Sequence, residues 1–199
     1  MIELYGSSMS SSGRTRWMLE EVGLPYEYKR IDARNGQTKS EEYLRIFPGG
    51  KVPALRDGDL VLGESMAINF YLAEKYKPEL VPSNLVERAQ AYQWSFWAIT
   101  NLQPDLVTVM VDGMRPPGQQ KPEAVASAKA RLQPLLAFLE HSLVGRQYLL
   151  GNRFTVADVN AASVVNLARQ TGLLATLPNA GAWMERLAAR PAYQRASKD

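Results

Sequence analysis

One change of pattern along the chain limits its fold more than any other feature. Strand patterns occur only before residue 63, whereas the later segments have the apolar spacing of helices. In the first part, the predicted order is strand, helix, strand, helix, strand, strand, helix. A βαβ unit followed by a ββα unit forms a small mixed sheet covered by helices. We therefore expect an α/β domain followed by an all-helical domain.

Turn-forming residues mark the ends of the predicted elements. Asp57-Gly58 predicts a hairpin, and Gly23 is suited to end the first helix. Prolines in residues 78–84 indicate a linker between a first domain, 1–77, and a second domain, 85–199. The predicted elements of the first domain cover residues 2–5, 14–22, 26–31, 40–46, 52–55, 60–62 and 65–76. The predicted helices of the second domain cover residues 85–111, with a kink or interruption at Pro104, then 123–143, 156–171 and 180–189.

Composition excludes several classes of protein. The chain has no cysteine, so it has no disulfides, no thiolate metal site and no thiol–disulfide chemistry of its own. Its net charge is +3 without a concentrated basic patch, which argues against nucleic-acid binding. The N-terminus lacks a signal-peptide pattern, and no apolar run reaches the ~20 residues that span a bilayer. His141, the single histidine, has no recognisable partner in the sequence, so we expect no metal site. We also expect a cytoplasmic protein with no membrane contact.

A serine-rich turn over residues 7–13 joins the first strand to the first helix. Hydroxyls and free N–H groups at a helix N-terminus favour negative charge at that place. A thiol bound there would have its pKa lowered, because hydrogen bonds to the thiolate favour the charged form. The alternative is that one serine is an ordinary N-cap, and spacing alone leaves that alternative open.

Two further segments are suited to bind a peptide. If the bond before Pro53 is cis, Val52 can offer its N–H and C=O to a ligand in the manner of an added strand. Glu64 can pair with an ammonium group, and the N–H of Ser65 is free for a carboxylate at the start of a helix. Together they suit an α-amino acid head group. The alternatives are an ordinary strand start and a helix capped by Ser65.

The segment from Phe154 to Val159 has a structural pattern. Thr155 and Asp158 have the spacing of a capping box, with Asp in place of the usual Glu or Gln. Phe154 and Val159 stand at the positions of a hydrophobic staple. We assign these residues to folding and not to catalysis.

The order and spacing of these features resemble the cytosolic glutathione transferase family across essentially the whole chain. Residues 19–26 and 71–76 are also similar to phrases of that family. The resemblance implies a thioredoxin-like first domain that holds glutathione and an all-helical second domain. It is closest to serine-type bacterial members. Two departures stand out: Phe47-Pro48 replaces the frequent Asn-Pro, and the serine-rich turn lacks the cysteine of thiol-transfer classes.

The resemblance also implies residue roles. Val52, before a cis Pro53, would bind the cysteinyl backbone of glutathione. Glu64 and Ser65 would hold the γ-glutamyl end, and Lys51 would lie near the glycine carboxylate. The candidates for the hydroxyl that meets the thiolate are Ser10, which we favour, and then Tyr5, Ser8 and Ser11.

The implied activity is transfer of alkyl or aryl groups to glutathione, a co-substrate, with no tightly bound cofactor. The electrophile pocket is expected between Met9 and the long helix, lined by Trp94, Trp97, Asn101, Asp105 and Met110. The tryptophans could instead belong to the core or to a subunit contact. A homodimer is expected through helices 65–76 and 85–111. Alternatives are a non-catalytic interaction protein and a glutathione-dependent isomerase, dehalogenase or peroxidase.

Overall fold

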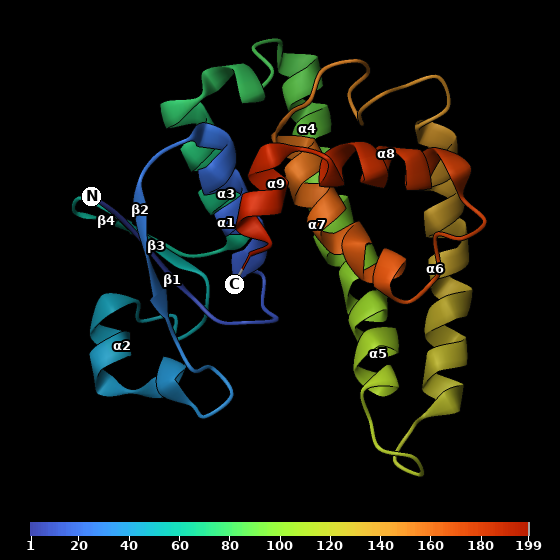
Figure 1. Cartoon of the computed structure of the whole chain (residues 1–199), viewed down its shortest axis with the longest axis horizontal. Coiled ribbons are helices and arrows are strands. Elements are labelled where there is room, and N and C mark those ends of the chain that lie inside the picture. Colours follow the sequence, from blue (N-terminus) through green and yellow to red (C-terminus); the bar gives the residue numbers. More distant parts are fainter. Residues whose placement is uncertain (199) are drawn as a thin grey trace. The chain divides into compact units, whose positions relative to one another are not determined.

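The computed structural model describes residues 1–198. The chain forms two compact units (Figure 1). Unit 1 contains residues 1–81 and the segment that begins at Arg190, and unit 2 contains residues 82–189. In the part of the chain that is described, no helix is both long and apolar enough to cross a membrane. The expected combination of an α/β unit and a helical unit is confirmed.

Unit 1 is built on a four-stranded sheet with the order β2-β1-β3-β4. Strands β1 and β2 are parallel, and the other neighbouring pairs are antiparallel. Parallel strands need a crossover connection, which α1 supplies between β1 and β2. The elements of this unit are β1 (Ile2–Gly6), α1 (Ser12–Val22), β2 (Tyr26–Arg30), η1 (Gln37–Lys39), α2 (Glu41–Ile46), β3 (Ala54–Asp57), β4 (Leu60–Leu62), α3 (Ser65–Tyr76), η2 (Pro78–Leu80) and α9 (Pro191–Ala196).

The two faces of the sheet carry different cores. Successive side chains of a strand point to opposite faces, so Leu4 and Tyr5 of β1 face opposite ways. Tyr5 packs with Tyr43 of α2 and Ala54 of β3 in one buried cluster. Leu4 is fully buried and pairs with Leu55 across the sheet. Figure 1 shows α1 and α3 together on one side of the strands, with α2 apart from them.

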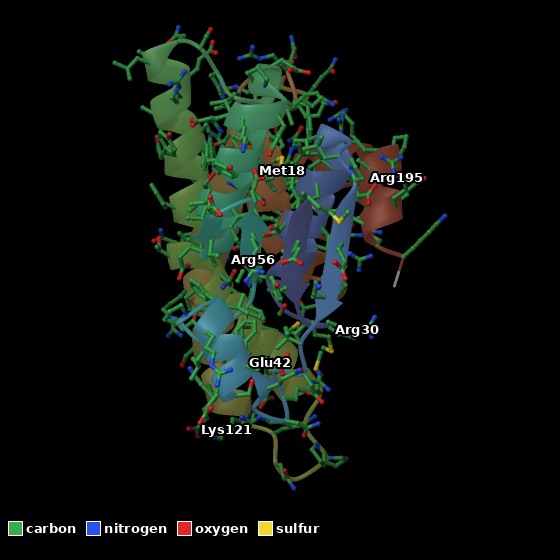
Figure 2. All side chains as sticks on the ribbon, turned by 90° about the vertical axis from the view of Figure 1, so that its left-hand side faces the viewer. Met18, Arg30, Glu42, Arg56, Lys121 and Arg195 are labelled. Atoms are coloured by element: carbon green, nitrogen blue, oxygen red, sulfur yellow. The ribbon has the colours of Figure 1, made fainter. Side chains whose placement is uncertain are left out.

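The last described residues return to unit 1. Arg190 makes two hydrogen bonds of 2.7 Å to the buried carboxylate of Glu21, and the Trp17 indole donates to the same carboxylate at 2.9 Å. The rings of Trp17 and Tyr193 meet edge to face at 4.9 Å. In Figure 2, the label Arg195 marks α9. The predicted second domain included these residues, because contacts between α1 and positions so far away along the chain leave no local pattern.

Unit 2 is all helical, as expected from the sequence. The predicted helix 85–111 is interrupted by a π-helical turn just before Pro104, which lies in the first turn of the following helix. A proline is tolerated there because the first N–H groups of a helix have no partner inside it. The elements of unit 2 are α4 (Leu85–Trp97), η3 (Ala98–Leu102), α5 (Gln103–Gly113), α6 (Pro122–Ser142), α7 (Val156–Gln170) and α8 (Pro178–Ala188).

Asp158 joins three parts of unit 2. One carboxylate oxygen accepts from the backbone N–H of Thr155 at 2.9 Å, which completes the predicted capping box. The other oxygen accepts from the N–H of Leu149 at 2.9 Å and from the indole of Trp183 at 3.0 Å. Burial raises the pKa of Asp158 to about 6, while these donors lower it, so the group remains mostly charged at neutral pH.

Candidate functional site

The sheet brings three predicted motifs to one end of unit 1. In the antiparallel pair β1 and β3, Tyr5 lies opposite Ala54, so the end of β1 adjoins the start of β3. In the pair β3 and β4, Leu55 lies opposite Leu62, so the end of β4 lies there too. The serine-rich turn follows β1, the Val52-Pro53 segment precedes β3, and the Glu64-Ser65 segment follows β4. Residues distant in sequence therefore share one edge of the sheet.

Ser10 is held inside the serine-rich turn by its own hydroxyl. This hydroxyl donates to the carbonyl oxygen of Ser7 at 2.7 Å and accepts from the N–H of Ser12 at 3.2 Å. The hydroxyl oxygens of Ser10 and Ser12 also lie 2.7 Å apart. Since a hydroxyl has one donor and two acceptor positions, these bonds occupy all three. Ser10 can donate to a ligand only by withdrawing its hydrogen from Ser7.

The neighbouring groups of the turn make fewer hydrogen bonds than the Ser10 hydroxyl does. Ser11 is the N-cap residue of α1, yet its side chain makes no capping hydrogen bond. In residues 1–198, the backbone N–H groups of Ser10 and Ser11 donate to no other group of the chain. Ser8 is exposed, and Met9 has a left-handed backbone with φ 53°. The start of α1 therefore offers two backbone N–H donors, those of Ser10 and Ser11, to an anion.

The Tyr5 hydroxyl, the second candidate for contact with the thiolate, is occupied elsewhere. The Tyr5 side chain is 4% exposed and lies in the cluster beneath α2. Its hydroxyl donates to the carboxylate of Glu3 at 2.7 Å. Burial, together with this bond to Glu3, raises the pKa of Tyr5. The hydrogen of the Tyr5 hydroxyl is therefore taken by the carboxylate of Glu3, a residue of the same strand.

The Val52–Pro53 peptide bond is cis, as the resemblance implied. Strand β3 begins only after it, at Ala54, and not at Val52 as predicted, because proline has no N–H to give to the ladder. Within the described chain, the N–H and C=O of Val52 make no hydrogen bond. The carbonyl of Lys51 accepts from the buried Tyr43 hydroxyl at 2.6 Å, which fixes the backbone beside Val52.

Cationic side chains lie close to this segment. Lys51 is exposed, as is Lys39 of η1. A Cβ built on Gly50 would lie 2.7 Å from the ammonium nitrogen of Lys39, so this lysine closely approaches the Gly50 backbone. Lys39 was not among the predicted site residues, because its distance from Gly50 along the chain gives no local pattern.

Glu64 and Ser65 open α3 in an unusual conformation. Glu64 has φ 61°, a region that residues other than glycine rarely occupy, and its side chain is exposed. Ser65 is 3% exposed, and its hydroxyl accepts from the Arg14 guanidinium at 3.4 Å. The helix begins at Ser65, but its N-cap residue is Glu64, so the alternative of a helix capped by Ser65 is wrong.

Arg14 is the main residue near this end that sequence analysis did not assign to the site. It is 7% exposed, and burial lowers its pKa to about 10, so it is still charged at neutral pH. A signal existed in the sequence: Arg14 precedes the buried Trp17 and Met18 by three and four residues, which places all three on one helical face.

The comparisons with known proteins agree with this architecture. Residues 2–74 match the glutathione S-transferase N-terminal domain, and residues 102–191 match the C-terminal domain. Glutathione S-transferase 3 of Zea mays is 35% identical, with 98% of this chain and 92% of that protein covered. The chain belongs to the glutathione S-transferase family. Unit 1 has the thioredoxin-like fold of this enzyme family.

Two solved glutathione S-transferases resemble the whole chain. One, glutathione S-transferase-I bound with lactoylglutathione, has a TM-score of 0.87 and 35% identity, with 98% of each chain covered. The other is the theta class enzyme of Xanthomonas axonopodis pv. citri with glutathione bound. It has a TM-score of 0.86 and 32% identity, with 100% of this chain and 97% of that chain covered.

The residues expected to contact the electrophile lie on both units of this transferase. Met9, on unit 1, is 64% exposed. On unit 2, Trp97 contacts the rings of Trp94 and Phe138, with centroids 5.1 and 5.6 Å away. Trp94 is 7% exposed and belongs to the core of unit 2, whereas Trp97 is half-buried and stays a candidate for the electrophile pocket.

Asn101 and Asp105 have partners of their own on unit 2. The side chain of Asn101 donates to Thr100 at 2.9 Å, and the carboxylate of Asp105 binds Arg131 through two hydrogen bonds, of 2.6 and 3.0 Å. A cavity of about 750 Å³ lies elsewhere on this unit and includes only Met110 of the expected residues. It is lined by Val109, Met110, Asp112, Gly113, Met114, Gln120, Pro122, Val125, Ala126, Lys129, Gln170 and Thr171.

Proposed function

We propose that this chain binds glutathione at the shared sheet edge of unit 1 and transfers it to a hydrophobic electrophile. The observation that carries the proposal is the pair of unused backbone groups at Val52, beside a cis proline. A peptide ligand can pair with such groups as an added strand. The relatives and the solved neighbours that carry the name glutathione transferase support the same assignment.

The proposed roles divide the tripeptide among three segments. Val52 would pair with the cysteinyl backbone, while Glu64 and the N–H of Ser65 would hold the γ-glutamyl ammonium and carboxylate. Lys51 would lie near the glycine carboxylate. Each contact joins groups of opposite charge or a donor to an acceptor, so they orient the thiol without reacting with it.

The chemical step uses the thiol of glutathione as the nucleophile. Loss of its proton gives a thiolate, which attacks an electrophilic carbon, so that a carbon–sulfur bond forms as the leaving group departs with its electron pair. A thiol with an ordinary pKa of ~8.5 is mostly protonated at neutral pH. The serine-rich turn would lower that pKa through a hydroxyl hydrogen bond and the N-terminus of α1, the arrangement expected of a serine-type transferase.

Calorimetric titration with glutathione tests the binding step. We expect a dissociation constant in the range of about 1 μM to 1 mM, and glutathione-dependent conjugation of chlorodinitrobenzene. Replacing Glu64 with Gln should weaken binding, because the ammonium group loses its charged partner. The matched control is Glu74→Gln, a change in an exposed carboxylate on α3 that should leave binding unchanged. Absence of binding by the unmodified chain would identify an interaction protein instead.

A homodimer is the proposed assembly. Helix α4 exposes apolar side chains that a partner subunit would cover: Leu85 is 80%, Val86 66% and Phe96 57% exposed. Tyr92 stacks on Phe96 with ring centroids 6.3 Å apart, which extends this apolar surface. Light scattering at micromolar concentration should give about 44 kDa, twice the 22.2 kDa of one chain. A stable species near the mass of one chain would contradict the dimer.

The proposed reaction also indicates a compartment. A reaction that depends on a free thiol requires reducing conditions, and the chain has no cysteine that would form a disulfide. We therefore place the activity in the cytoplasm.

A further inference from the structure

Phe47 connects the two backbone segments that the proposed function assigns to glutathione. It directly follows α2, where its N–H donates to the carbonyl of Tyr43 at 2.9 Å. Its own carbonyl accepts from the N–H of Gly50 at 3.0 Å, which closes the turn before Lys51. The half-buried side chain packs against the cluster that contains Tyr5 and Tyr43. Backbone and ring are therefore both held in place.

The ring of Phe47 lies against two glycines. A Cβ built on Gly49 would come within 2.7 Å of the ring, and a Cβ on Gly63 within 2.2 Å of it. Real Cβ atoms essentially never approach another heavy atom this closely. The ring thus fills the space that side chains at both positions would need, so it contacts both backbones directly.

Each glycine precedes a proposed binding segment. Gly49 lies just before Lys51-Val52, and Gly63 lies immediately before Glu64. Glu64 has φ 61°, a conformation that persists only where the surrounding structure enforces it. The Phe47 ring is a rigid group in contact with the residue that leads into this conformation.

We propose that Phe47 is a positioning residue that sets the spacing between the Val52 segment and the Glu64-Ser65 segment, and thereby the affinity for glutathione. The inference rests on the proposed function, because it needs glutathione to span these two segments. Phe47 would act through the backbones of Gly49 and Gly63 and would not touch the reacting sulfur. Its loss therefore affects binding and not the chemical step.

Substitution of Phe47 tests the proposal through the separation of KM from kcat. Phe47→Ala should raise the KM and the dissociation constant for glutathione about tenfold or more, with kcat at saturating glutathione within about twofold of the unmodified enzyme. Phe47→Leu keeps part of the volume and should restore part of the affinity. An unchanged KM in Phe47→Ala overturns the inference, whereas failure of the unmodified chain to bind glutathione overturns the proposed function.

A double-mutant cycle with Gly63 gives a second, independent measure. Gly63→Ala places a Cβ in the space of the ring and should weaken glutathione binding by displacing Glu64. In the Phe47→Ala background this Cβ has room, so the added loss of affinity should be small. If the losses of affinity are additive in the double variant, then contact between the Phe47 ring and residue 63 is not the cause of the weaker binding.

A control separates positioning from general destabilisation. Ile2 is 5% exposed and lies at the opposite end of β1 from the site. Ile2→Ala removes buried volume from the same unit, so it should lower the melting temperature without changing the KM for glutathione. If Ile2→Ala raises the KM as much as Phe47→Ala does, the effect of Phe47 is merely structural and the inference fails.

Discussion

Replacing Asp158 with alanine should lower the free energy of unfolding by about 3–5 kcal/mol. The change removes the cap of α7 and leaves the N–H groups of Thr155 and Leu149 and the Trp183 indole buried without an acceptor. Each such buried donor costs about 1–3 kcal/mol. The loss is a large share of the roughly 5–15 kcal/mol that stabilises a typical protein. Chemical denaturation followed by circular dichroism measures it, and glutathione affinity per folded molecule should not change.

A second cap in unit 2 is the matched control. The side chain of Asn84 caps α4 by accepting from Val86 and Glu87, but this end of the helix is exposed. Asn84→Ala should cost only about 1 kcal/mol. Asp158→Asn should be nearly as damaging as Asp158→Ala, because its NH₂ group would face another donor. Equal costs for Asn84→Ala and Asp158→Ala would show that the contacts of Asp158 beyond the cap add nothing.

Replacing Ser10 with alanine should reduce turnover of chlorodinitrobenzene at neutral pH by about a hundredfold. A hydrogen bond from a hydroxyl to an anion contributes about 1.5–3 kcal/mol, and a shift of two pKa units corresponds to about 2.7 kcal/mol. Glutathione affinity should change little, because the contacts assigned to Val52 and Ser65 remain. The deficit should shrink as pH rises, since the thiolate then forms without help. The ultraviolet absorbance of the bound thiolate against pH measures the pKa directly.

Two further variants identify the donor. Ser11→Ala removes a hydroxyl that makes no capping bond and should leave the thiolate pKa near that of the unmodified enzyme. Tyr5→Phe removes a hydroxyl that is bound to Glu3, and it should also change the thiolate pKa little. If the pKa rises only in Ser11→Ala, then Ser11 is the donor and Ser10 serves the turn. A rise only in Tyr5→Phe would identify a tyrosine-type enzyme, and no rise in any variant would assign the effect to backbone N–H groups or Ser8.

Local patterns predicted the parts of the fold in which neighbouring residues bond to each other. The hairpin at Asp57-Gly58 and the start of α3 at Ser65 depend on backbone preferences within a few residues. The capping box of Thr155 and Asp158 spans three residues and has the same local origin. The cis bond before Pro53 followed from the resemblance to the family, since an X-Pro bond alone is compatible with either form.

Features that depend on distant contacts were not predicted. The helix at 191–196 belongs to unit 1, where the preceding Arg190 binds Glu21, a residue far away in the sequence. The role of Asp158 as an acceptor for Trp183 likewise exists only once α7 and α8 pack together. The serine-rich turn alone did not reveal that Ser10 already donates to Ser7 and accepts from Ser12, because the fold of the turn orients those groups.

The sequence by itself determined the family, the order of strands and helices, and the segments around Ser10, Val52 and Ser65 that the proposed site uses. It could do so because caps, turns and apolar periodicity are local properties of the chain. Only the tertiary structure brought those segments to one edge of the sheet and placed the Phe47 ring against Gly49 and Gly63. The physical reason is that strand register and side-chain packing join residues that have no fixed separation along the chain.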